Sequence, residues 1–153
     1  MKKLLICLLS IFVCNFGFSQ SADIVTEIID APVATYGQVC YLSACDRGLI
    51  QDDATYEDAV KTLFEMGEIP ESVKADDTIN YERVAFYFSK LWKINGGFFF
   101  RVTKGSSRYA FRQLRLDGVI PKYIDPNRIP SGADVLNMYT LGDATYNKGG
   151  AEY

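Results

Sequence analysis

The chain has 153 residues, with 16 Lys and Arg against 19 Asp and Glu, and it contains no histidine. The lack of histidine excludes catalysis by an imidazole base and zinc sites with histidine ligands. The acidic balance argues against a nucleic-acid-binding protein, and the length is that of one domain that can bury its own core.

The first 19 residues have the pattern of a secretory signal peptide. Lys2 and Lys3 precede an apolar run, and cleavage is predicted after Ser19. Removal of residues 1–19 leaves 14 basic and 19 acidic side chains, a net charge of −5, and no segment apolar for long enough to span a bilayer. We therefore expect a secreted, periplasmic protein that is not transmembrane after signal cleavage.

A lipoprotein signal acylated at Cys14 is the alternative interpretation of the same segment. Phe12 and Val13 precede this cysteine, whereas lipidation signals of that type place a small residue there. The choice between the two signals decides whether the protein is free or anchored to lipid.

After the signal, residues 20–34 are expected to form an extended leader. Five helices are predicted from cap residues, apolar stripes and glycine turns. They cover residues 36–47, 55–67, 80–94 and 106–118, and the fifth begins at Ser131. A short extended or loop segment is predicted at about 98–103, and residues 142–153 are expected to be a flexible tail.

An internal repeat organises these helices. Residues 110–121 (AFRQLRLDGVIP) repeat residues 59–70 (AVKTLFEMGEIP) at an offset of 51, which continues into the following helices. The segment that ends at Gly48 resembles a third, partial copy. Helix, glycine turn, loop and second helix form a unit that needs its neighbours to bury its apolar face. The repeat predicts an all-α fold: tandem helical hairpins in a compact five-helix bundle.

Only two cysteines, Cys40 and Cys45, remain after signal cleavage. They lie five residues apart in a predicted helix, so they point to different faces and are too far apart for an unstrained bridge. We interpret them as small buried apolar residues, or as one buried and one free thiol. An intermolecular disulfide is the alternative in an oxidising compartment.

The turn Gly-Val-Ile-Pro, the loop with Asp125, Pro126 and Asn127, and the helix start Ser-Gly-Ala-Asp from Ser131 resemble the S-layer homology repeat. The resemblance covers roughly residues 36–141. It implies non-covalent binding of cell-wall polysaccharide or a peptidoglycan-linked polymer, partly through an Arg at the helix start. That Arg is replaced here by Tyr81 in one copy and Gly132 in the other. The signal that ends in Phe-Ser-Gln, and the Gly-Gly-aromatic segment followed by Arg-Tyr-Ala-Phe-Arg, are also loosely similar to small uncharacterised spirochaete envelope proteins.

Basic residues gather in one part of the chain. Residues 101–128 carry seven basic and two acidic side chains, whereas the rest of the mature chain has a net charge of −10. Arg108, Arg112 and Arg115 are spaced to share one helix face, and Arg101 lies just upstream. This basic face is our candidate for contact with an anionic polymer or an acidic protein, and a solvated face that balances the acidic remainder is the alternative.

Aromatic residues form the second candidate surface. Phe98, Phe99 and Phe100 follow a double glycine, and Phe86 falls on the polar side of its predicted helix. Such a group marks a contact surface when exposed, although aromatic runs also form cores.

The sequence predicts a binding or scaffold module of the cell envelope, not an enzyme. No metal or cofactor site is expected, because two cysteines without any histidine cannot form a closed zinc site. Three acidic pairs occur, two beside a predicted helix start and one in a connecting loop, and we interpret the first two as helix caps: Asp52–Asp53, Glu57–Asp58 and Asp76–Asp77. The expected partner is a cell-wall polymer or another envelope protein. The alternatives are a protein-interaction subunit of an envelope assembly without wall affinity and, less favoured, a small carboxylate-dependent hydrolase.

Overall fold

The computed structural model describes residues 17–94 and 106–147, which form six α-helices and no strand. The helices are α2 (Gly17–Asp30), α3 (Tyr36–Asp46), α4 (Tyr56–Glu65), α5 (Tyr81–Leu91), α7 (Ser107–Leu116) and α8 (Gly132–Tyr146). The predicted all-α fold is confirmed, but the predicted number of five helices is too low. The segment predicted at 98–103 lies outside the described residues. None of the described helices is both long enough and apolar enough to cross a membrane.

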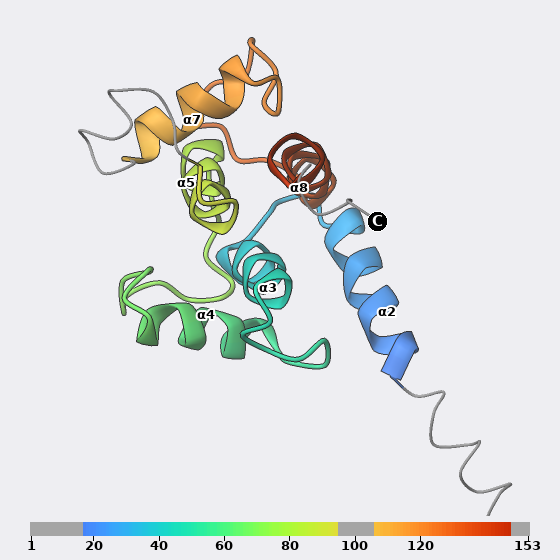
Figure 1. Ribbon diagram of the computed structural model, residues 1–153. Helices are drawn as coiled ribbons and strands as arrows, with labels where there is room; N and C mark the ends of the chain where they lie inside the picture. Colours follow the sequence, from blue (N-terminus) through green and yellow to red (C-terminus); the bar gives the residue numbers. More distant parts are fainter. Residues whose placement is uncertain (1–16, 95–105, 148–153) are drawn as a thin grey trace, which may run out of the picture.

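The six helices form three units arranged around a common centre (Figure 1). Each unit has an outer helix followed by an inner helix: α2 and α3, α4 and α5, α7 and α8. The inner helices α3, α5 and α8 lie at the centre, while α4 packs on α3, α7 on α5 and α2 on α8. Each outer helix therefore covers the inner helix of the neighbouring unit, and α2 closes the ring by covering the last one.

Equivalent main-chain hydrogen bonds join the three units at the start of each inner helix. The N–H of Tyr36 donates to the carbonyl of Asp77 (2.9 Å), and that of Tyr81 donates to Arg128 (3.0 Å). The third bond runs from Gly132 to Ala31 (2.9 Å) and so returns to the first unit. Three bonds of one kind, each directed to the next unit, show that the repeat closes on itself.

The N-terminal segment is helical, which corrects the predicted extended leader at residues 20–34. Ile24 and Ile28 lie one turn apart on α2, and Ile28 is completely buried where α2 meets α8. Gly132 makes this approach possible, because a Cβ at this position would stand 1.7 Å from the Ile28 carbonyl oxygen. Helix α2 was not predicted because its own residues form only a weak helix when considered alone, and the helix that stabilises it lies at the other end of the chain.

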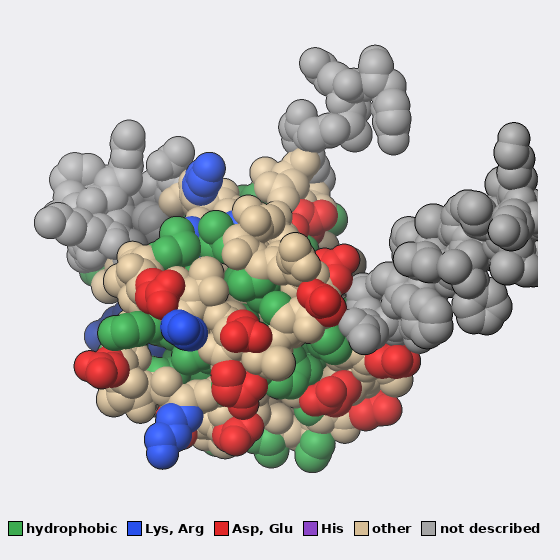
Figure 2. Space-filling model, turned by 90° about the horizontal axis from the view of Figure 1, so that it is seen from below, with side chains coloured by type: hydrophobic (Ala, Val, Ile, Leu, Met, Phe, Trp, Pro, Cys, Tyr) green, Lys and Arg blue, Asp and Glu red, His purple; other side chains and the backbone are tan. Residues whose placement is uncertain are grey.

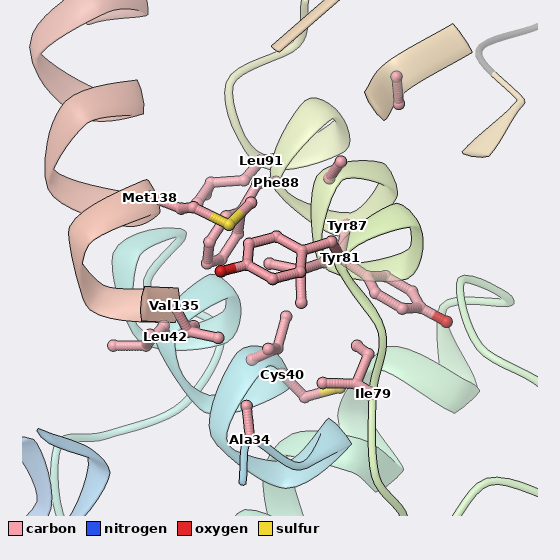
Figure 3. Close-up of a cluster of buried hydrophobic side chains, with 14 of the residues drawn as sticks. Ala34, Cys40, Leu42, Ile79, Tyr81, Tyr87, Phe88, Leu91, Val135 and Met138 are labelled. Atoms are coloured by element: carbon pink, nitrogen blue, oxygen red, sulfur yellow. The ribbon is translucent and has the colours of Figure 1, made fainter. Parts of the chain in front are cut away.

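The core lies between the three inner helices (Figure 3). Val39, Val84 and Val135 occupy equivalent positions in α3, α5 and α8, and each is 0% exposed. Leu63 of α4 and Leu114 of α7 are also equivalent in the repeat, and both are buried where these outer helices pack on the inner ones. A buried residue recurs at the same place in each unit because each unit contributes one wall of the same core.

Three helix starts carry the predicted capping box, whereas Ser106, predicted to cap α7, makes no side-chain cap hydrogen bond. Thr35, Thr55 and Ser131 each form a capping box with the residue three positions later. Thr35 aligns with Asn80 and Ser131, the caps of the other inner helices. The third copy of the repeat is therefore the unit α2–α3, in which α3 is an inner helix, and not a copy of the helix that ends in Gly67.

The C-terminal segment is ordered further than predicted. Helix α8 continues to Tyr146, so residues 142–146 belong to the fold and not to a flexible tail. Gly142 lies directly against the indole of Trp92, and the ring of Tyr146 stacks on it at 5.5 Å between centroids. Trp92, only 7% exposed, supplies the apolar surface that holds the last turns of α8.

Candidate functional site

A groove of ≈ 610 Å³ runs beside α7, and we call it the α7 groove. Its walls come from α7, from the loop that follows α7 and from the first turn of α5. The lining residues are Glu82, Arg108, Phe111, Arg112, Arg115, Leu116, Lys122, Pro126 and Asn127. The groove thus gathers four cations and one carboxylate around three apolar side chains.

The loop wall of the groove is held by buried apolar residues and a glycine turn. Gly118 has φ +81°, which lets the chain reverse after α7, and the N–H of Val119 donates to the Leu114 carbonyl at 2.9 Å. Val119 and Ile120 are 2% and 1% exposed, so they anchor the loop in the core. The cations of the groove therefore project from a fixed backbone.

The arginines of the groove are not neutralised by the acidic residues near them. Asp117 accepts a hydrogen bond from Gln113 at 2.8 Å and another from the hydroxyl of Tyr146. The Glu82 carboxylate accepts from the hydroxyl of Ser107. Within residues 17–94 and 106–147, no ion pair is formed by any of the four cations of the groove: Arg108, Arg112, Arg115 and Lys122.

Two of the arginines lie over aromatic rings. The guanidinium carbon of Arg112 is 5.9 Å from the centre of the Tyr109 ring, and that of Arg115 is 5.6 Å from the Phe111 ring. Such contacts limit the freedom of the side chains while leaving the guanidinium N–H donors available. The groove consequently presents pre-positioned donors, which reduces the entropy lost on ligand binding.

The structure brings together part of the predicted basic face. Arg108, Arg112 and Arg115 line the α7 groove, with Arg108 and Arg112 exposed and Arg115 half-buried. Arg101, the fourth predicted residue, lies outside the described residues. The basic face therefore rests on three described arginines and on Lys122, which comes from the loop.

The predicted apolar surface is not assembled in the described part of the chain. Phe98, Phe99 and Phe100 lie outside the described residues. Phe86 is half-buried against the core, and the Lys90 ammonium lies 4.4 Å from the centre of its ring. Phe86 is thus covered partly by its own helix and offers less free surface than its position on the helix suggested.

Several lining residues of the groove were not predicted from the sequence. Leu116 is 78% exposed and follows Arg108 and Arg112 along the same face, so helical spacing alone would have found it. Glu82 and Asn127 reach the groove from other elements. Their places depend on how α5 and the loop pack on α7, which local sequence does not reveal.

Three of the acidic side chains have local structural roles. Asp58 accepts hydrogen bonds from the backbone N–H and the hydroxyl of Thr55, and Asp77 accepts from the backbone N–H of Lys74. The carboxylate of Asp125 accepts from the N–H of Asn127 at 2.7 Å. In the described ranges, no group of three or more Cys, Asp or Glu side chains is placed to hold a metal ion.

Both cysteines of the predicted mature chain carry free thiols, with Cys40 buried and Cys45 half-buried, as one of the sequence interpretations expected. Burial raises the pKa of the Cys40 thiol to about 12, so it stays protonated at neutral pH. Cys40 is therefore an inert part of the core.

The side chains around α7 can bind an anion, because several guanidiniums with free N–H donors line one groove beside exposed apolar surface. Comparisons with protein-family models, with curated proteins and with solved structures gave no match to this chain.

Proposed function

We propose that this protein is a non-enzymatic binding module of the cell envelope whose α7 groove holds an anionic polymer. The observation that carries the proposal is the set of four cations in one groove without an acidic partner among the described residues. Nearby carboxylates take their hydrogen bonds from Gln113, Tyr146 and Ser107 instead. A groove built in this way retains its positive potential for a ligand.

The chemistry of the groove favours carboxylate or phosphate groups on a polymer. Guanidiniums bind such groups with paired N–H donors, and several along one groove can engage successive charges. Leu116, which is 78% exposed, adds apolar surface beside them, and this suits a ligand with an apolar face, such as a sugar ring. A wall-linked polymer with charged saccharide units combines both properties.

The resemblance to S-layer homology repeats supports a wall ligand, but this chain cannot contact the ligand through the residue at the family's Arg position. Tyr81, at the family's Arg position, is only 3% exposed, and Gly132 is pressed against the backbone of α2. Neither position can present a charge to a ligand. In this proposal the cations of α7 take over that role.

Export by residues 1–19 would place the protein in the periplasm, where it would meet this polymer, and acylation of Cys14 would add a lipid anchor. The non-enzymatic part of the proposal rests on the local roles of the acidic side chains. Asp58 and Asp77 are held in helix and loop hydrogen bonds, which leaves them poorly placed for acid–base catalysis.

A protein-interaction subunit is the second candidate, favoured by an exposed apolar row on α2 and the linker after it. Val25, Ile29 and Val33 are spaced four residues apart and are 37%, 49% and 43% exposed. A protein partner bound to this row would be held mainly by apolar contact. Its binding would be insensitive to salt, in contrast to binding in the α7 groove.

Cosedimentation of residues 20–153 with purified peptidoglycan sacculi, with their attached polymers, tests the proposal. We expect the protein to pellet at low salt and to be released at high salt. The variant R108A/R112A/R115A should bind about a hundredfold more weakly or worse, since three lost charge-assisted contacts of about 1 kcal/mol or more each add up to about 3 kcal/mol or more.

The matched control is K61A/K74A/R83A, which removes the same charge from exposed positions outside the α7 groove. It should bind within about twofold of the unchanged protein, because surface charge at a distance is screened. The proposal fails if the unchanged protein stays in the supernatant at low salt, or if both triple variants bind equally well.

A further inference from the structure

The repeat carries a second groove at the place that corresponds to the α7 groove. It has a volume of ≈ 420 Å³ and is formed by α4 and the loop after it, so we call it the α4 groove. Seven of its lining residues correspond to those of the α7 groove at the offset of 51. The pairs are Glu57 and Arg108, Val60 and Phe111, Lys61 and Arg112, Phe64 and Arg115, Glu71 and Lys122, Ala75 and Pro126, and Asp76 and Asn127.

The backbones of the two grooves are held by the same hydrogen bonds. After α4, the N–H of Glu68 donates to the Leu63 carbonyl at 2.9 Å, as Val119 does to Leu114 after α7. Within the loops, the N–H of Val73 donates to Pro70 at 3.2 Å, and this bond recurs between Ile124 and Pro121. Each loop also accepts a bond from the inner helix of the preceding unit: the N–H of Gly37 donates to Ala75 (2.8 Å) and that of Glu82 donates to Pro126 (3.0 Å). The two grooves are therefore built on one backbone design.

The charge of the two grooves differs at four of the paired positions. Glu57 replaces Arg108, Phe64 replaces Arg115 and Glu71 replaces Lys122. Asp76 adds a carboxylate where the α7 groove has Asn127. One position keeps its charge, since Lys61 corresponds to Arg112. Figure 2 looks at the molecule from the α4 side of Figure 1, and acidic side chains outnumber basic ones on this face.

The first unit has no corresponding loop. Only residues 31–35 join α2 to α3, whereas residues 66–80 join α4 to α5 and residues 117–131 join α7 to α8. Two grooves of the same construction therefore occur in the described part of the chain, and they differ in charge more than in backbone.

We infer that the α4 groove is a second copy of the polymer-binding groove, and that Arg108, Arg115 and Lys122 are the residues that restrict anion binding to the α7 copy. This inference rests on the proposed function of the α7 groove. Carboxylates at positions 57 and 71 repel an anion, and Phe64 offers no donor to replace a guanidinium. The unchanged protein should consequently bind one anionic chain, in the α7 groove.

The inference is tested by introducing the charged residues of the α7 groove into the α4 groove. The test begins from R108A/R112A/R115A, which lacks the α7 site, and adds E57R, F64R and E71K to the α4 groove. Binding of fluorescein-labelled inorganic polyphosphate is followed by fluorescence anisotropy at low salt. We expect the added residues to restore affinity to within about threefold of the unchanged protein, because they reproduce its charges on the same backbone.

A control variant adds D30K, D53R and N137R to the same background. It gains the same charge at exposed positions that line neither groove, and it should stay weak. Circular dichroism should show all variants folded, since the changed side chains are exposed or half-buried.

Recovery only with the α4 changes supports the inference. If the unchanged protein binds polyphosphate and the α4 variant, although folded, recovers no more than the control, the inference is wrong and the proposed function stands. If the unchanged protein binds neither polyphosphate nor sacculi, the proposed function itself has failed.

Discussion

Closure of the three-unit ring by α2 can be tested with the substitution Gly132→Ala. The new Cβ would stand 1.7 Å from the Ile28 carbonyl oxygen, so α2 must move away from α8. That movement breaks the hydrogen bonds from Gly132 to Ala31 and from Ala34 to Pro130, both 2.9 Å long. Each bond is worth about 1 kcal/mol, and burial of Ile28 about 2 kcal/mol, so the loss in unfolding free energy should be about 3 to 5 kcal/mol.

Urea unfolding followed by circular dichroism gives this free energy, and hydrogen exchange at the amides of residues 23–30 shows whether α2 remains docked. Asn137→Ala, an exposed substitution on the same helix, is the control and should change the free energy by less than about 0.5 kcal/mol. If Gly132→Ala left both stability and exchange in α2 unchanged, closure of the ring through α2 would be refuted.

Three further predictions concern the core and the caps. Truncation after Leu141 should shift the fluorescence of Trp92, the only tryptophan, to longer wavelength, because the last turns of α8 cover its indole; an unshifted spectrum would contradict the packing of these turns. In Ellman titration of the native protein with the signal removed, Cys40 should stay unreactive, because burial raises its pKa to about 12, while Cys45 should react slowly; rapid reaction of two thiols would show that α3 is not buried. Burial favours the neutral form of Asp134, but its hydrogen bonds at the start of α8 lower its pKa overall. The contribution of Asp134 to the free energy of unfolding should therefore be fully present above about pH 4 and should be lost as the pH falls through the lowered pKa. An NMR titration that gives the Asp134 carboxyl a pKa above the usual value would contradict this.

Local signals in the sequence were sufficient to predict five of the six described helices. Thr35, Thr55 and Ser131 marked helix starts through capping boxes, and Gly67 and Gly118 marked helix ends through their left-handed turns. These features depend on a few neighbouring residues, so a sequence pattern contains them. The offset of 51 also predicted correctly that Val84 and Val135 occupy equivalent places.

Features that depend on contacts between distant parts of the chain could not be predicted from the sequence. Helix α2 is stabilised by α8, more than 100 residues away, and the tight approach at Gly132 carries no pattern of its own. The end of α8 likewise depends on Trp92 of another unit. Both were predicted to be irregular because their own residues make weak helices when considered alone.

The candidate site was predictable in its charge but not in its shape. Helical spacing put Arg108, Arg112 and Arg115 on one side of a helix, and the structure places a groove there. That Glu82 and Asn127 complete its walls follows only from the packing of α5 and the loop. The matching α4 groove could have been suspected from the repeat, since the offset of 51 connects Glu57 with Arg108.

NMR mapping of the polymer-binding surface tests the central claim most directly. Wall polymer released from sacculi would be titrated into ¹⁵N-labelled protein of residues 20–153. We expect the amide shifts to concentrate in α7 and in residues 119–127, to weaken as salt is added and to vanish in R108A/R112A/R115A. Shifts centred on Val25 and Ile29 of α2, or no shifts at low salt, would contradict the assignment of the α7 groove as an anionic-polymer site.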